Sequence, residues 1–217
     1  MAKQERSERT LERLVMSAAE QFAEQGFVRA TLADVSKSAG VTKGALFFHF
    51  STKDELADVV QARGRDVLET LVEELHDPDA SRLQVLVDLT HSLNDLLREN
   101  SFIRASVRIT RERTHQEPTP LDFYPLWLGR LWKLLEDARK NGELGKSVAD
   151  VSARTLVTAA VSGVETLAWM GVSRQDAEEW LSNLWGLVLP LLTAEDSERL
   201  IRTTAPAAGA VHVDAER

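Results

Sequence analysis

The chain has 217 residues, of which 43% are hydrophobic, and it carries a formal net charge of −8 with no cysteine. This length suits a small domain joined to a larger one, and the lack of cysteine excludes disulfides, thiolate nucleophiles and cysteine-based zinc sites. The histidines, at positions 49, 76, 91, 115 and 212, are spaced too widely to pair as metal ligands, so we expect no metal and no cofactor.

The acidity is unevenly distributed along the chain. Residues 1–65 contain ten Lys and Arg against nine Asp and Glu, whereas the remainder contains sixteen against twenty-five. A nearly neutral N-terminal part can bind DNA if its cations converge on one face, because affinity depends on local phosphate contacts.

Two features bear on location. The N-terminus, MAKQERSERT, is charged from its third residue and lacks an apolar signal core, so we expect a cytoplasmic protein. The most apolar stretch, residues 155–172, contains Glu165 and several hydroxyl side chains. We therefore expect no membrane segment.

Apolar residues recur at three-and-four spacing along nearly the whole chain, without period-two alternation, which predicts an all-α fold. Many expected helix starts carry Ser or Thr followed three positions later by an acidic or amide residue, namely Thr31/Asp34, Thr52/Glu55, Ser81/Gln84, Ser147/Asp150, Ser173/Asp176 and Thr193/Asp196. Ten helices are expected, at 5–25, 32–39, 43–49, 52–76, 81–99, 101–114, 122–140, 150–170, 174–192 and 194–203.

The first three helices predict a separate domain at residues 1–52. The first has an apolar stripe and ends at Gly26, and the next two are short helices that flank Gly40 and begin after Thr31 and Thr42. Two short helices across a glycine turn, packed on a longer one, are typical of a helix-turn-helix. We expect a ligand-binding and dimerisation domain at residues 53–203 and a disordered tail at 204–217.

The second short helix, KGALFFH, has chemistry that suits DNA. Free N–H groups at a helix start attract phosphate oxygens, and Thr42 adds a hydroxyl there. Lys43 can reach a guanine edge or a phosphate, and Gly44 allows a close backbone approach. His49 and Lys53 follow, where flanking phosphates would pass. The alternative is that this helix packs in a core and Lys43 is solvated.

The run TLADVSKSAGVTKGALFFHFSTKDEL resembles the TetR family of bacterial repressors over about residues 10–60. The resemblance implies that the DNA-facing residues are Thr31, Thr42, Lys43, Gly44, Phe47, Phe48, His49 and Lys53. Many members have tyrosine in one or both aromatic positions, whereas Phe47 and Phe48 offer no hydroxyl to a phosphate. One phenylalanine is then expected in the core, and the other against a sugar or a thymine methyl group.

The resemblance also implies dimerisation through the last two long helices. Helix 150–170 is apolar on nearly every side, and helix 174–192 carries more apolar residues than one core-facing stripe needs. A four-helix interface formed by two such helices from each subunit would bury this surplus. We therefore expect a homodimer.

The segment VTKGAL followed by FHF, together with Trp127, is most similar to the γ-butyrolactone receptor branch of the family, in which a corresponding tryptophan lines the ligand pocket. The alternative for Trp127 is a place in the core. An apolar cavity with a few hydroxyl groups suits a γ-butyrolactone, a furan or an antibiotic. The other candidate pocket residues, each of which could equally be plain core, are Leu89, Leu93, Val107, Thr110, Leu131, Thr158, Val161, Ser162 and Trp169.

These observations predict a repressor that binds a pseudo-palindromic operator in double-stranded DNA and is released by a small-molecule effector. Nothing in the sequence indicates an enzyme, since it has neither a metal-spaced cluster nor a phosphate-binding glycine loop. An alternative of another class is a helical adaptor whose N-terminal domain does not bind DNA.

Overall fold

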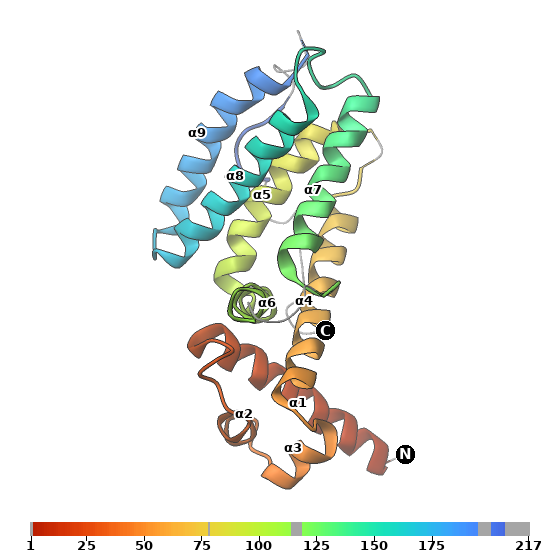
Figure 1. The fold of residues 1–217 in the computed structure, drawn as a ribbon, viewed down its shortest axis with the longest axis vertical. Coiled ribbons are helices and arrows are strands. Elements are labelled where there is room, and N and C mark those ends of the chain that lie inside the picture. The colour runs from red at the N-terminus through yellow and green to blue at the C-terminus, as the bar shows by residue number, and fades with distance from the viewer. Residues whose placement is uncertain (1, 78, 114–118, 195–200, 207–217) are drawn as a thin grey trace. The chain divides into compact units, whose positions relative to one another are not determined.

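The computed structural model describes residues 2–77, 79–113, 119–194 and 201–206. The described residues form α-helices and no strand, which confirms the all-α prediction. They form nine helices (Figure 1): α1 Ala2–Gln25, α2 Leu32–Ser38, α3 Lys43–His49, α4 Lys53–Glu74, α5 Arg82–Glu99, α6 Ser101–Glu112, α7 Phe123–Lys140, α8 Asp150–Trp169 and α9 Arg174–Leu192.

The tenth predicted helix, 194–203, is only partly described. Residues 195–200 lie outside the described residues, and those on either side of them are not helical. Of the predicted tail, residues 207–217 also lie outside the described part of the chain.

Side-chain caps explain where several helices begin. Thr31, Thr52, Ser81 and Ser173 each accept a hydrogen bond from the backbone N–H three residues later, as predicted. The predicted cap at Ser147 is wrong, because α8 is preceded by Ala149 and has no side-chain cap.

The chain divides into two compact units. Unit 1 comprises Met1–Leu68 and Asn100–Leu126, and unit 2 comprises Glu69–Glu99 and Trp127–Arg217. The predicted boundary after residue 52 therefore falls inside unit 1, which also takes in α6. Helices α4 and α7 each continue from one unit into the other.

In unit 1, α6 packs along α1 and holds its C-terminal end. Arg108 donates hydrogen bonds to the carbonyl oxygens of Ala23 and Glu24, at 3.1 and 2.9 Å, while Glu112 accepts one from the backbone N–H of Val28 at 2.7 Å. Gly26 has a φ of 91° at this turn, and a Cβ there would lie 2.5 Å from the Glu112 carboxylate. The positive φ is the reason that this turn needs glycine, because the Glu112 carboxylate ends a flexible side chain that could move aside.

In unit 2, α5 packs against α8 and α9, and α8 and α9 pack on each other. The indole N–H of the fully buried Trp185 in α9 donates to the hydroxyl of Thr90 in α5 at 2.8 Å. This bond satisfies a polar group that would otherwise be costly to bury.

A short segment after α9 also lies on α5. The side-chain amide of Gln84 donates to the carbonyl oxygen of Arg202 and accepts from its N–H, at 3.2 and 2.7 Å. The Arg202 guanidinium is 2.8 Å from Asp88, and His91 Nε2 lies 2.8 Å from the Thr203 carbonyl oxygen. Unit 2 thereby includes chain beyond its last helix.

Candidate nucleic-acid interface

A threonine side chain caps the N-terminus of each of the two short helices, α2 and α3. The hydroxyls of Thr31 and Thr42 accept hydrogen bonds from the N–H groups of Asp34 and Ala45, each at 3.2 Å. Thr31 also donates to the Asp34 carboxylate at 2.5 Å. The start of α2 therefore carries a negative charge, whereas α3 has no acidic residue in its first turn. Of these two helix starts, that of α3 is the better suited to phosphate.

The N-terminal half and outer face of α3 are open to solvent. Thr42, Lys43 and Gly44 are exposed, and Leu46 is the residue of α3 that enters the core. This arrangement argues against the alternative in which α3 is chiefly a core element. The polar N-terminal end of α3 is accessible to a ligand.

Both phenylalanines of α3 are on the surface. Phe47 is 56% exposed and Phe48 is 79% exposed, so the expectation that one of them belongs to the core is wrong. The core position is taken instead by Phe50, which is 5% exposed. Two exposed aromatic rings beside Lys43 form a surface suited to deoxyribose and thymine methyl contacts.

The two remaining candidate residues of this region are partly buried. The His49 ring packs edge-on against Phe48, with centroids 5.2 Å apart. The Lys53 ammonium donates to the carbonyl oxygens of Phe27, Val28 and Ala30, at 2.8 to 3.3 Å. Lys53 therefore joins the start of α4 to the loop between α1 and α2, a fold-supporting contact that the motif does not reveal.

A buried polar network in unit 1 was also missed by sequence reasoning. Arg113 forms ion pairs with Asp54 and Asp58 of α4, at 3.0 and 2.7 Å, and lies 4.9 Å from the centre of the Phe27 ring. It donates to the buried Gln61 at 3.3 Å as well. In the sequence, only the charged residues at the end of α6 hint at this network, because Arg113 and its partners lie far apart along the chain.

The candidate effector residues fall into two groups. Val107 and Thr110 belong to unit 1, where the Thr110 hydroxyl accepts from the N–H of Phe123 at 3.0 Å and from Gln61 at 3.3 Å. The remaining candidates belong to unit 2. Among these, Leu89, Leu93, Trp127, Leu131 and Val161 are at most 1% exposed.

The other unit 2 candidates are more accessible. Thr158 is half-buried, Ser162 is exposed and Trp169 is 37% exposed. The structure therefore groups the apolar candidates in the interior and leaves these three residues of α8 nearer the surface.

Helices α8 and α9 present complementary exposed faces. On α9 the exposed residues Trp180, Leu184, Leu187 and Leu191 follow three-and-four spacing. On α8 and its C-cap residue the exposed stripe is made of mostly small residues, Ser152, Ala159, Gly163, Thr166 and Met170. A Cβ at Gly163 would meet nothing within 4 Å, so packing among the described residues does not require this glycine.

Two classes of site find no support in the described part of the chain. No group of three or more His, Asp or Glu residues there could hold a metal ion. Among the same residues, no helix is both long and apolar enough to span a membrane.

Comparison with known proteins identifies the N-terminal region. A family model for bacterial regulatory proteins of the tetR family matches residues 14–60. The A-factor receptor protein of Streptomyces griseus is 28% identical over 191 residues, which are 88% of this chain and 66% of that protein. The chain thus spans just under two thirds of the length of that relative.

Solved structures extend the similarity over most of the chain. One, described as the molecular basis for control of antibiotic production by a bacterial hormone, is 30% identical with a TM-score of 0.72, covering 85% of this chain and 98% of the other. Another, a γ-butyrolactone receptor described as ArpA-like, is 26% identical with a TM-score of 0.73, covering 89% and 92%.

These matches confirm the predicted resemblance to γ-butyrolactone receptors. They also agree with the expectation that the chain is not an enzyme, because the matched family consists of regulatory proteins. With its helix-turn-helix unit and its larger helical unit, the chain belongs to the TetR family of bacterial transcriptional regulators.

Proposed function

We propose that the protein is a homodimeric, cytoplasmic repressor that binds a pseudo-palindromic operator through α3 and is released by a small apolar effector bound in unit 2. The exposed face of α3 is the main support. Its capped N-terminus has no acidic residue in the first turn, and Lys43, Gly44, Phe47 and Phe48 are all exposed. This combination suits the major groove better than it suits a helical adaptor surface.

The exposed faces of α8 and α9 support the homodimer. The large residues of the α9 stripe complement the small residues of the α8 stripe, so two copies related by a two-fold axis would pack α9 of each on α8 of the other. Two glycines within these helices, Gly163 and Gly186, have open space around the missing Cβ. A glycine inside a helix costs roughly 0.5 to 1 kcal/mol, which a close approach by a partner helix would explain.

A dimer of this kind would present two α3 helices to one operator. Half-sites about 34 to 36 Å apart, one turn of DNA, would match such a pair. The effector would act by binding the DNA-free state more tightly, so operator and effector must weaken each other reciprocally.

The effector class is inferred from the relatives and from the interior of unit 2. The relatives include an A-factor receptor and a γ-butyrolactone receptor. The buried candidates Leu89, Leu93, Trp127, Leu131 and Val161 are almost all aliphatic, which suits the apolar part of a γ-butyrolactone, a furan or an antibiotic.

Operator binding is tested by exchanging Lys43 for alanine. The operator fragment is first selected from random duplexes with the unaltered protein. The Lys43→Ala variant should then bind it more weakly and with a smaller salt dependence, because one phosphate or guanine contact is lost. Lys146→Ala, an equal charge change at an exposed site in unit 2, is the control. Equal operator affinity and salt slope in both variants would contradict the assignment of α3.

Effector release is tested separately through Trp127. If this indole contacts the effector, a γ-butyrolactone that dissociates the unaltered protein should leave Trp127→Ala bound to its operator. If it is only part of the core, the variant should instead lose about 3 to 5 kcal/mol of stability, and ligand should still release the DNA. Melting temperature and operator release, measured on the same preparation, distinguish these outcomes.

A further inference from the structure

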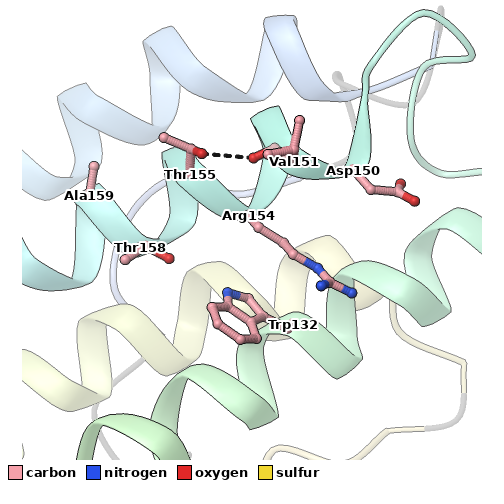
Figure 2. A pocket seen from close by; sticks show the side chains of 7 residues that line it. All are labelled: Trp132, Asp150, Val151, Arg154, Thr155, Thr158 and Ala159. Atoms are coloured by element: carbon pink, nitrogen blue, oxygen red, sulfur yellow. Dashed lines mark hydrogen bonds between the residues drawn. The ribbon is translucent and has the colours of Figure 1, made fainter.

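A groove on the surface of unit 2, formed by α7 and α8, is lined by residues with the chemistry of a ligand site (Figure 2). Its volume is about 580 Å³, within the range of small-molecule sites. The lining residues are Trp132, Asp150, Val151, Arg154, Thr155, Thr158 and Ala159. Trp127 does not line it, although Thr158, another of the candidate effector residues, does.

The groove contains hydrogen-bond donors next to an aromatic wall. Trp132 Nε1 is buried and has no hydrogen-bond acceptor among the described residues. The indole nitrogen lies on the edge of the ring that faces α8, from which Thr158 projects (Figure 2). A buried N–H without an acceptor is costly, and a ligand carrying an oxygen acceptor would satisfy it.

Arg154 supplies a positive charge beside the same ring. Its guanidinium carbon lies 5.4 Å from the centre of the Trp132 ring, and its Nη2 is 2.8 Å from Glu136. Both members of this ion pair are more than 40% exposed, so water screens the pair and it contributes little. Because the guanidinium has five N–H donors, Arg154 can donate to a second carboxylate while its guanidinium remains against the indole ring.

An adjoining hollow of about 300 Å³ shares Asp150 and Arg154 with the groove and adds further cations. Arg139 is already occupied by Asp150 and by the carbonyl oxygens of Gly145 and Val148. The ammonium of Lys140 is 3.3 Å from Asp137, and its side chain is 68% exposed. The apolar wall at Trp132 therefore continues into a part of the surface where three basic residues face Glu136 and Asp150.

From these contacts we infer that the groove between α7 and α8 binds a small anionic amphiphile, with its apolar body on Trp132 and its carboxylate at Arg154. One carboxylate oxygen would accept from Arg154, and the other would accept from Trp132 Nε1 or Thr158. A neutral ligand would leave the cation without a new partner, so the site should prefer an acid to the matching alcohol.

The groove and the proposed dimer face adjoin on α8, where Ala159 belongs to both. At 100° per residue, Arg154 lies about a third of a turn from Thr166 and about half a turn from Gly163, so its side chain starts from another side of α8. A second copy that packed on the small-residue stripe would leave the groove open on the side of α7. The inference uses neither operator binding nor Trp127, and its central residues, Trp132 and Arg154, belong to neither the candidate effector set nor the proposed dimer face.

The test compares two probes with one chain length, decanoate and 1-decanol, by calorimetric titration of the DNA-free, full-length protein. We expect decanoate to bind at least tenfold more tightly than decanol and to change tryptophan emission. Arg154→Gln should abolish this preference while leaving decanol binding unchanged. Trp132→Phe should weaken both probes and remove the emission change, whereas Trp180→Phe, at an exposed position outside the groove, should preserve binding.

Equal affinity for the acid and the alcohol, or an unchanged preference in Arg154→Gln, would overturn the inference. Sedimentation of Arg154→Gln as a monomer, with decanoate binding retained, would also overturn it by assigning the groove to the interface between copies. These measurements use protein without DNA. A failure of the repressor proposal would therefore not change them and would be recognised separately.

Discussion

Arg113, at the C-terminal end of α6, forms an ion pair with Asp58 of α4 in which Nη1 lies 2.7 Å from Oδ1. The arginine side chain is 6% exposed and the aspartate side chain is 51% exposed, so a buried cation is held by a carboxylate that remains partly hydrated. The same guanidinium pairs with Asp54 and lies against Phe27, which joins α6 and α4 to the loop before α2 within unit 1.

The first prediction concerns this contact. Arg113→Met should lower the free energy of unfolding of the protein by about 2 to 3 kcal/mol, because charge-assisted hydrogen bonds are lost while both carboxylates can be rehydrated. Arg113→Lys should restore only part of the loss, since an ammonium cannot reproduce the arginine fork. Urea unfolding followed by circular dichroism measures both. Full stability in the methionine variant would show that the network is energetically unimportant.

A second prediction separates fold from DNA contact at Gly44. A Cβ there would meet nothing nearer than the Thr42 hydroxyl at 3.9 Å, so the packing of α3 does not require glycine. Gly44→Ala should raise stability by about 0.5 to 1 kcal/mol through helix propensity, and yet weaken operator binding if the backbone approaches DNA closely. Gly129→Ala in α7, also in open space, is the control and should leave operator affinity unchanged. An unchanged operator affinity in Gly44→Ala would argue against a close approach of the α3 backbone to DNA.

A third prediction addresses the dimer. Leu187 on α9 is 73% exposed, and Leu187→Glu would place a charge in the centre of the proposed interface. Sedimentation at micromolar concentration should shift from dimer to monomer, and operator affinity should fall with it because the two half-sites are no longer bound together. Leu11→Glu, on a partly exposed leucine of α1, should leave the protein dimeric. A Leu187→Glu variant that remains dimeric would exclude this face.

The fourth prediction is a pH dependence of stability. Burial lowers the pKa of His91 from its usual value of 6.5, against the opposing effects of the Thr203 carbonyl oxygen and the nearby carboxylates of Asp88 and Glu178. Because the folded-state pKa lies below the unfolded one, the contribution of His91 to stability is present above pH 6.5 and is lost as the pH falls from 6.5 through the lowered folded-state pKa.

His91→Gln, which retains a donor for the Thr203 carbonyl oxygen, should flatten this part of the stability curve. The melting temperature of each protein, measured from pH 7.5 to 5, gives the comparison. Burial raises the pKa of Asp88, so its contribution has the opposite sign and appears at the acidic end. Parallel curves for the two proteins would mean that His91 is as easily protonated in the folded state as in the unfolded one.

The helix-turn-helix unit could be predicted well from sequence because its determinants are local. The caps at Thr31 and Thr42 and the turn at Gly40 each depend on residues within a few positions, and all three are present in the structure. Two expectations failed, namely that one of Phe47 and Phe48 lies in the core and that Ser147 caps a helix. The environment of an aromatic ring and the start of α8 both depend on packing that a local pattern does not contain.

The parts of the site that sequence reasoning missed are long-range contacts. Lys53 donates hydrogen bonds to carbonyl groups 23 to 26 residues earlier, and Arg113 contacts Asp58 and Asp54, which lie 55 and 59 residues earlier. The exposed apolar stripe on α9 could be predicted, because helical periodicity alone places its residues on one face. The groove beside Trp132 was not, because it requires the relative placement of α7 and α8.

The contact between Gln84 and Arg202 has a consequence for how this chain can vary. Gln84 bonds to the main chain of residue 202, through one N–H and one carbonyl group that every residue except proline provides. Substitution at position 202 should therefore preserve the attachment and lose only the ion pair with Asp88, whereas substitution at position 84 should remove both main-chain bonds and leave the contacts made by Asp88 and His91. The anchor constrains the sequence of α5 at Gln84 and leaves the attached segment free to diverge.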